Sequence, residues 1–268
     1  MPLPPPSESS TALVTGASSG IGADIARELA SRGHGLVLTA RREDRLRGLA
    51  DELGGENGVR CEVIGADLSD AVARARLQDR IAELGLTVEV LVNTAGFGGF
   101  GAVHRLEPAR QVEMVRLNCE ALVDLHARYS AEMRERGRGA ILNVASMAAF
   151  QPLPGSGCYA ATKAFVLSLS EASSAELRDR GVTVTALCPG PVQTEFGEVA
   201  GVAENEGQLP GPFWTPVEQV ARDAVEGLEK GKRVVVPGLL NRAGALTGQH
   251  LPRAAMLPLA NRFRRAAL

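Results

Sequence analysis

Lysine is almost absent from this chain. Of the 29 basic residues only Lys163, Lys230 and Lys232 are lysines, and arginine supplies all the Lys/Arg charge before position 163. Because this chain uses arginine for its general surface charge, a lysine at position 163 indicates a role that arginine would not fill. Tyrosine is equally scarce, and one of the two tyrosines, Tyr159, stands four positions before that lysine. We therefore expect Tyr159 and Lys163 to share a specific role.

Several other features are missing, and each absence narrows the class of protein. The four cysteines lie far apart without a CxxC pair, which indicates small buried residues in a reducing compartment, the cytoplasm, rather than disulfides or a metal site. There is no run of 18 uncharged apolar residues, so no membrane-spanning helix is expected. Residues 1–10 carry no basic and apolar signal pattern. A net charge of −2 gives no general reason to expect nucleic-acid binding.

Short aliphatic runs alternate with longer amphipathic segments along the 268 residues. Seven runs have the nearly continuous apolar character of strands buried on both faces, at residues 11–16, 35–40, 59–67, 88–96, 140–146, 182–190 and 233–238. The segments between them have helical spacing, and several end at glycine, a common residue at helix C-termini. This alternation predicts a single doubly wound α/β domain whose seven-stranded, mostly parallel sheet carries helices on both faces.

Three segments fall outside that alternation. Residues 1–10, with three consecutive prolines, predict a flexible tail ahead of a domain that spans residues 11–238. Residues 195–214 are rich in glycine and proline and form a candidate substrate lid. Residues 239–268 form a basic, partly apolar extension, because the chain from Lys230 onward has eight basic residues and no acidic one.

The stretch TGASSGIG, residues 15–22, follows the first predicted strand and opens the first predicted helix. A nucleotide pyrophosphate bound there needs a sharp turn and a close approach to helix N–H groups, whose dipole favours an anion. Gly16, Gly20 and Gly22 supply that room. The spacing G-x3-G-x-G differs from the GxGxxG of other dinucleotide folds, and a plain glycine turn is the alternative interpretation.

Two arginines follow the second predicted strand, where an enzyme that selects NAD usually has an acid for the ribose 2′-hydroxyl. Here the strand ends at Ala40, and Arg41 and Arg42 come next. A guanidinium pairs bidentately with a 2′-phosphate, which an acid would repel. We therefore expect NADP(H), with Arg41 the better candidate. The alternative is that both arginines belong to a solvated helix face.

Polar residues also follow the third and fourth predicted strands, in GADL and NTAG. The carboxyl ends of parallel strands are where doubly wound sheets bind ligands. Asp67 could accept a hydrogen bond from an adenine amino group, and Asn93 and Gly96 could line the adenosine side. Taken singly, each of the three is better explained as a turn residue.

Tyr159 and Lys163 lie four apart on a predicted helix, so their side chains share one face. An ammonium close to a phenol favours the phenolate and lowers the tyrosine pKa from its ordinary value near ~10. Tyr159 could then exchange a proton with a carbonyl or alcohol oxygen. Ser146, at a predicted strand end, could hydrogen-bond the same oxygen, and Asn118 could hold a water linked to Lys163. A chance spacing and a structural asparagine are the alternatives.

Together these motifs closely resemble those of the short-chain dehydrogenase/reductase family over residues 11–238. The resemblance is carried in order by TGASSGIG, NTAG, Asn118, Ser146, YAATK and CPGPVQT, with NTAG in place of the commoner NNAG. It implies a Rossmann-type domain, a nicotinamide cofactor and the catalytic residues Asn118, Ser146, Tyr159 and Lys163. It implies that the cofactor-binding residues are Gly16, Ser18, Ser19, Gly20, Ile21, Gly22, Arg41, Arg42, Asp67, Leu68, Asn93, Ala95, Gly96, Tyr159, Lys163, Pro189, Gly190, Val192 and Thr194.

The reaction implied by this resemblance is NADP(H)-dependent hydride transfer between nicotinamide and a carbonyl compound or secondary alcohol. Tyr159 would act as acid or base and Ser146 would orient the oxygen. Lys163 would bind the ribose and lower the Tyr159 pKa, with Asn118 as proton relay. The alternatives are an NAD-linked alcohol dehydrogenase, which an acid at position 40 would favour, and a non-catalytic dinucleotide sensor or scaffold, which loss of the tyrosine or lysine would favour.

The substrate and the assembly are less closely defined. Bulky residues fall in segments near the expected pocket and suggest an apolar or bulky substrate, although lid packing would explain them equally: Phe97, Phe150, Leu153, Phe196, Phe213 and Trp214. The helix after Tyr159 is rich in small residues, and the resemblance implies that it and the helix around residues 119–135 form a homodimer or homotetramer interface. The last residues could contact an anionic membrane surface; packing on a neighbouring subunit or over the active site is the alternative.

Overall fold

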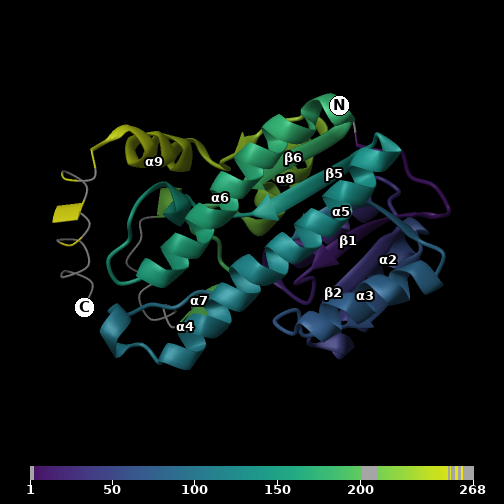
Figure 1. The fold of residues 1–268 in the computed structure, drawn as a ribbon, viewed down its shortest axis with the longest axis horizontal. Helices are drawn as coiled ribbons and strands as arrows, with labels where there is room; N and C mark the ends of the chain where they lie inside the picture. Colours follow the sequence, from purple (N-terminus) through teal and green to yellow (C-terminus); the bar gives the residue numbers. More distant parts are fainter. Residues whose placement is uncertain (1–2, 201–210, 253, 255–256, 259–260, 262–268) are drawn as a thin grey trace.

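The computed structural model describes residues 3–200, 211–252, 254, 257–258 and 261 (Figure 1). Within them one sheet contains β1 (Ser10–Thr15), β2 (Leu36–Ala40), β3 (Cys61–Gly65), β4 (Thr87–Asn93), β5 (Gly139–Val144), β6 (Val182–Leu187) and β7 (Val234–Val235). The strand order is β3-β2-β1-β4-β5-β6-β7, and every neighbouring pair is parallel. The predicted seven-stranded α/β fold is confirmed, although β7 is shorter than expected.

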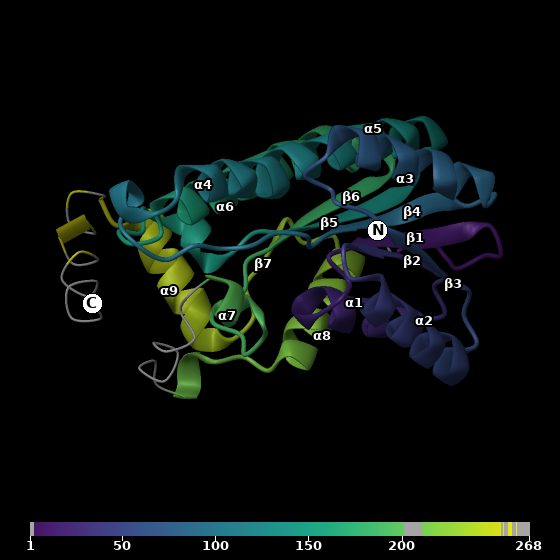
Figure 2. The same cartoon turned by 90° about the horizontal axis from the view of Figure 1, so that it is seen from below.

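Helices cover both faces of the sheet. Figure 2 shows α1, α2 and α8 on one face and α3, α5 and α6 on the other. The helices are α1 (Gly20–Ala30), α2 (Glu43–Asn57), α3 (Ala71–Glu83), α4 (Pro108–Val115), α5 (Leu122–Arg136), α6 (Gly157–Leu177), α7 (Phe196–Ala200), α8 (Val217–Glu229) and α9 (Leu239–His250). A π-helical turn, Arg116–Ala121, joins α4 to α5. In the described part of the chain no helix is both long and apolar enough to cross a membrane.

Each strand supplies side chains to two separate apolar layers. In β1 Val14 packs with α1, α2 and α8, whereas Leu13 packs with α3 and α5. In β4 Val92 belongs to the layer with α1, α2 and α8, and Leu91 belongs to the layer with α3 and α5. Successive residues of a strand point to opposite faces, so a sheet covered on both sides needs apolar residues at nearly every position. This requirement explains why the strands are continuous apolar runs in the sequence.

The site is positioned by the point where the sheet reverses its winding. From β1 the chain builds outward to β2 and β3 on one side, and then returns to β4 on the other side of β1. In doubly wound sheets the carboxyl ends of the two strands at such a point leave a crevice that binds ligands. The turns that follow β1 and β4 therefore open into the same space.

The N-terminal segment lies against this domain. Leu3 packs on the core and Pro4 is buried. Ser7 and Ser10 exchange hydrogen bonds between side chain and backbone, and β1 begins at Ser10. Residues 3–9 thus have defined contacts, and the flexibility expected for residues 1–10 stays a prediction.

The chain beyond residue 238 differs from the appended extension expected from its composition. Its first twelve residues form α9, and Asn241 on this helix is 2% exposed. The Asn241 side-chain amide donates to Thr215 Oγ1 at 3.2 Å and to the Pro237 carbonyl at 3.1 Å. These bonds fasten α9 to the segment before α8 and to the end of β7. Most of residues 251–268, including the basic end, lie outside the described residues.

A buried polar network joins the sheet to α5 and α6. The Asn143 side-chain amide, on β5, donates to His126 Nδ1 at 3.1 Å and to Ser170 Oγ at 2.9 Å. His126 Nδ1 must therefore be an acceptor, which places the proton on Nε2, 2.9 Å from Ser173 Oγ. Burial lowers the pKa of His126 below its usual 6.5. A second proton would place a donor against the Asn143 amide, so the fold holds the imidazole neutral.

This network makes stability depend on pH. Because the folded pKa of His126 lies below 6.5, the unfolded chain binds more protons as the pH falls. The free energy of unfolding should therefore be highest above about pH 7 and decline below about pH 6.5. We expect His126→Gln to reduce this decline when denaturant unfolding is followed from pH 8 to pH 5. The exposed His104→Gln variant should keep the wild-type slope, and an unchanged slope in His126→Gln would contradict the assignment.

Candidate active site

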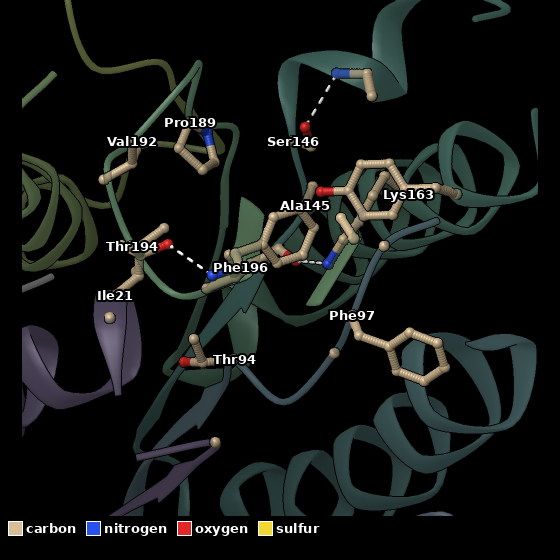
Figure 3. Close-up of a pocket in the computed structure, with 18 of the residues that line it drawn as sticks. Ile21, Thr94, Phe97, Ala145, Ser146, Lys163, Pro189, Val192, Thr194 and Phe196 are labelled. Atoms are coloured by element: carbon tan, nitrogen blue, oxygen red, sulfur yellow. Dashed lines mark hydrogen bonds between the residues drawn. The ribbon is translucent and has the colours of Figure 1, made fainter. Parts of the chain in front are cut away.

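A cavity of about 960 Å³ opens at the carboxyl ends of the strands. In Figure 3 the loop carrying Pro189, Val192 and Thr194 borders one side of it, and Ser146 and Lys163 lie on the other. Most of the predicted site residues line this cavity: Gly16, Ser18, Ser19, Gly20, Ile21, Gly22, Arg41, Arg42, Asp67, Leu68, Ala95, Gly96, Ser146, Tyr159, Lys163, Pro189, Gly190, Val192 and Thr194. Asn93 and Asn118 are not among the lining residues.

The glycine turn is packed too closely for side chains. Gly16 has a φ of 66°, in the left-handed region, and a Cβ there would lie 2.9 Å from the Ala95 backbone. A Cβ on Gly22 would lie 2.5 Å from the Gly16 carbonyl oxygen. The first turn of α1 therefore sits directly on the loop after β1. A ligand in the cavity can approach the free N–H groups at this helix end.

Arg42 reaches across the glycine turn. Its guanidinium donates to Ser18 Oγ at 3.1 Å and to Ser19 Oγ at 2.8 Å, and it pairs with Glu195 Oε2 at 2.8 Å. Arg41, the candidate preferred from the sequence, is more exposed, and its closest carboxylate is Glu113, 3.8 Å away. Both arginines line the cavity, but the side chain directed at the glycine turn is that of Arg42.

The residues after β3 and β4 have different positions. Asp67 lines the cavity and its Oδ1 accepts from the backbone N–H and hydroxyl of Ser69, which lower the Asp67 pKa. Asn93 is 4% exposed, and its amide donates to Asn143 Oδ1 at 2.9 Å. The Asn93 side chain thus belongs to the buried network of His126 and is not among the residues that line the cavity, so its contact with adenosine stays a prediction.

Tyr159 and Ser146 both line the cavity. Tyr159 is in the first turn of α6, and Ser146 is the residue two beyond β5. Ser146 Oγ accepts from the backbone N–H of Ala148 at 3.1 Å, which fixes its position. Burial raises the pKa of Tyr159 to about 12, and the Ser146 hydroxyl opposes that rise. The phenol therefore keeps its proton at neutral pH.

Lys163 is buried one helical turn further along. It is 5% exposed, and its Nζ donates to the Val144 carbonyl at 2.7 Å (Figure 3). Nζ lies 5.8 Å from the centroid of the Tyr159 ring. Burial lowers the pKa of Lys163 to about 8. The lowered Tyr159 pKa expected from this lysine is not found, because the ammonium turns to a main-chain carbonyl and burial of the phenol dominates.

Asn118 occupies the π-helical turn between α4 and α5. Its Oδ1 accepts from the Phe97 N–H at 3.1 Å, and its Nδ2 donates to the Phe97 carbonyl at 3.0 Å and to Thr162 Oγ1 at 3.1 Å. These bonds hold the loop after β4 against α6. A Cβ added to Gly96 would lie 2.8 Å from Asn118 Oδ1 and 3.7 Å from Lys163 Nζ. Asn118 is thus close to Lys163, and its predicted proton relay stays a prediction.

Apolar side chains form the outer part of the cavity. The bulky residues named from the sequence all line it: Phe97, Phe150, Leu153, Phe196, Phe213 and Trp214. The Phe196 ring centroid lies 5.5 Å from that of Tyr159, so this wall begins beside the phenol. Of the predicted lid, residues 201–210 lie outside the described residues.

Two polar groups of the cavity come from segments that no motif indicated. Glu195, which precedes α7, reaches Arg42 more than 150 residues away in sequence. Asn241 on α9 approaches the loop after β6, where a Cβ on Gly190 would lie 2.5 Å from its Cγ. Neither residue belongs to a local pattern. The sequence signal that could have indicated Glu195 is its place directly after the CPGPVQT segment.

Comparison with known proteins gives the family. The family model described as short chain dehydrogenase matches residues 10–204. The NADP-dependent 3-hydroxy acid dehydrogenase YdfG of Salmonella typhi is 37% identical over 199 residues, 72% of this chain and 77% of that protein. A solved short-chain dehydrogenase from Sphingobium yanoikuyae, in complex with NADPH, matches with a TM-score of 0.80 and 35% identity, covering 93% and 95% of the two chains. A bulky-bulky ketone specific alcohol dehydrogenase from Comamonas testosteroni matches with a TM-score of 0.75 and 33% identity, covering 96% and 94%.

The cavity lies at the switch point of a doubly wound sheet, which is where such folds bind their ligands. The chain belongs to the short-chain dehydrogenase/reductase family, because the family model covers most of it. The resemblance found in the sequence motifs is therefore confirmed.

The close packing of the glycine turn gives a testable consequence. Gly22→Ala should lower the free energy of unfolding by roughly 1–3 kcal/mol, because the added methyl collides with the Gly16 carbonyl. The matched control is Gly48→Ala on α2, where a Cβ meets nothing within 4 Å; it should stabilise slightly through helix propensity. Chemical denaturation measures both. Equal stability of the two variants would contradict the packing described.

Proposed function

We propose that this protein is an NADP(H)-dependent reductase that converts the carbonyl group of an apolar or bulky compound to a secondary alcohol. The observation that carries the proposal is that Tyr159, Ser146 and the buried Lys163 line one cavity together with apolar side chains, with Lys163 Nζ 5.8 Å from the Tyr159 ring centroid. The family membership supports the reaction class.

The chain's own residues fit the cofactor. The glycine turn forms a cradle in which a Cβ at Gly16 or Gly22 would collide with backbone, and such a cradle suits a pyrophosphate. Lys163 would donate to the ribose hydroxyls, and Arg42 with Arg41 would pair with the 2′-phosphate. The cofactor supplies the hydride when bound. The NADPH complex of the Sphingobium yanoikuyae enzyme and the NADP-dependent name of the Salmonella relative support this choice.

Tyr159 is the proposed acid. With its pKa raised to about 12 it is protonated at neutral pH, which is the form that donates a proton to a carbonyl oxygen. Ser146 is held by the Ala148 N–H and would donate its own proton to the same oxygen, stabilising the negative charge that develops there. The protonated phenol is the form that reduction requires, and oxidation would require the phenolate.

Lys163 and Asn118 are proposed to support this proton donor. The Lys163 ammonium is one helical turn from Tyr159 and would stabilise the negative charge of the phenolate that remains when Tyr159 donates its proton. Asn118 holds the loop at Phe97 and lies near Lys163 across Gly96. It would keep a path open along which a proton returns to the site from solvent.

The apolar outer wall supports the proposed substrate class. The Phe196 ring lies tilted beside that of Tyr159, so a substrate carbonyl at the phenol would place its carbon substituents among aromatic side chains. Burying such groups is favourable by roughly 25 cal/mol per Å² of apolar surface. The similar enzyme from Comamonas testosteroni is named for bulky-bulky ketones, which agrees with a large apolar carbonyl compound.

Assembly and location are also proposed. Apolar side chains are exposed on α4 and α6, namely Val112 at 51%, Val115 at 45% and Phe165 at 41%. A homodimer or homotetramer that covers these helices would bury them. We keep the cytoplasm as the proposed compartment, and contact of the C-terminal end with an anionic membrane as the less favoured possibility.

The catalytic assignment is tested by Tyr159→Phe. Loss of the proton donor should lower turnover of NADPH with a panel of bulky ketones by about 10²–10⁴-fold, with NADPH binding retained. Tyr129→Phe is the matched control, since Tyr129 is the other tyrosine and is buried outside the cavity. It should keep wild-type turnover. Similar turnover in both variants would refute the role of Tyr159.

The cofactor assignment is tested by Arg42→Ala. The affinity for NADPH should fall about tenfold or more, as expected for charge-assisted hydrogen bonds, while the affinity for NADH changes little. Fluorescence titration with each cofactor measures this difference. Arg47→Ala, an exposed arginine on the same helix outside the cavity, should leave both affinities unchanged. An equal loss for NADPH and NADH in Arg42→Ala would exclude a 2′-phosphate contact.

A further inference from the structure

One carboxylate holds two arginines at the edge of the cavity. Arg42 donates to Glu195 Oε2 at 2.8 Å, and Arg45 pairs with Glu195 Oε1. The arginines come from the start of α2, whereas Glu195 comes from the loop before α7. The hydrogen bonds from Arg42 and Arg45 lower the pKa of Glu195 to about 2. The carboxylate is therefore negatively charged throughout the working pH range.

Glu195 is positioned by its neighbours in sequence. Thr194 packs at the glycine turn, where a Cβ on Gly20 would lie 3.2 Å from its side chain, and its Oγ1 accepts from the Phe196 N–H at 3.3 Å. Phe196 in turn packs against Tyr159. Residues on both sides of Glu195 are thus anchored in the cavity. The carboxylate is presented to the arginines by a fixed backbone.

The donors of Arg42 are already divided among its partners. Nε and one terminal nitrogen donate to Ser18 and Ser19, and the other terminal nitrogen donates to Glu195. Four of the five N–H groups of Arg42 are therefore engaged, and the fifth is on the nitrogen that bonds Glu195. A phosphate oxygen that approaches Arg42 from the cavity meets a guanidinium already shared with the Glu195 carboxylate.

Charge balance decides which anion this site prefers. Arg41, Arg42 and Arg45 together carry a charge of about +3, and Glu195 already neutralises one of these charges before a phosphate monoester near −2 arrives. With Glu195 still in place the phosphate and the carboxylate would share Arg42 and repel each other. The Glu195 side chain is 39% exposed and can turn to solvent. Displacement is therefore the favourable outcome when a 2′-phosphate is present.

We propose that Glu195 is a built-in competitor for the 2′-phosphate of NADP(H) and that it limits the preference of this protein for NADP(H) over NAD(H). The proposal rests on the proposed cofactor and adds Arg45 and Glu195 to the residues that determine its selection. NAD(H) has no 2′-phosphate and leaves the carboxylate in place. An NADP(H) molecule must either displace the Glu195 carboxylate from Arg42 or bind beside a like charge.

The test compares dissociation constants of NADPH and NADH for the full chain carrying Glu195→Gln. Glutamine has the same shape but no charge, so competition is weakened while the loop is retained. Exposed ion pairs contribute up to about 1 kcal/mol each, so NADPH should bind about three- to tenfold more tightly. NADH binding should change less than about twofold. Constant low ionic strength is needed, because salt screens these charges.

Glu198→Gln is the matched control. Glu198 is an exposed acid three residues further on, outside the cavity lining, and its replacement changes the net charge equally. NADPH affinity should stay within about twofold of wild type in this variant. A gain equal to that of Glu195→Gln would show a general charge effect and overturn the proposal.

Two further outcomes are distinguishable. Unchanged or weaker NADPH binding in Glu195→Gln, with wild-type protein that binds NADPH normally, overturns the competitor role and leaves the proposed function intact. Failure of the wild-type protein to bind either cofactor overturns the proposed function, and the competitor role with it. If Glu195→Gln, and not Glu198→Gln, binds NADPH more tightly while NADH binding is unchanged, the result supports the competitor role and the proposed function.

Discussion

The close contact between the turns after β1 and β4 is the constraint on which the site depends. Gly16 and Ala95 are so near that a single methyl group would separate them. This approach closes the floor of the cavity and directs the N-terminus of α1 into it. The same loop after β4 is held by Asn118 from the π-helical turn. The loop after β4 therefore positions both the glycine turn and the helix α6 that carries Tyr159.

The fold and most of the cavity could be predicted from the sequence because their signals are local. Seven apolar runs gave the strands, and Tyr159 with Lys163 gave one helix face. Glycines mark places where backbone must approach backbone. Where this reasoning failed, the determining contacts were long-range. Asn93 turned into the buried network with Asn143, and the Tyr159 pKa rose because burial in the assembled site outweighs a nearby ammonium.

Segments with no motif could not be placed by pattern at all. α9 was expected to be an extension because its composition is basic and apolar, yet Asn241 ties it to Thr215 and Pro237. Glu195 pairs with Arg42 across most of the chain. Such contacts depend on tertiary packing, which neither spacing nor propensity encodes. These contacts also place α9 and the segment before α7 in the wall of the cavity.

The scarcity of lysine has a consequence for how the molecule can be handled. Lys163 is enclosed, whereas Lys230 and Lys232 are exposed in the turn between α8 and β7. That turn lies at the amino end of β7, opposite the cavity. Chemistry directed at side-chain amines would attach a dye or a solid support at this one corner. Every tethered molecule would then face the solution with its cavity outward.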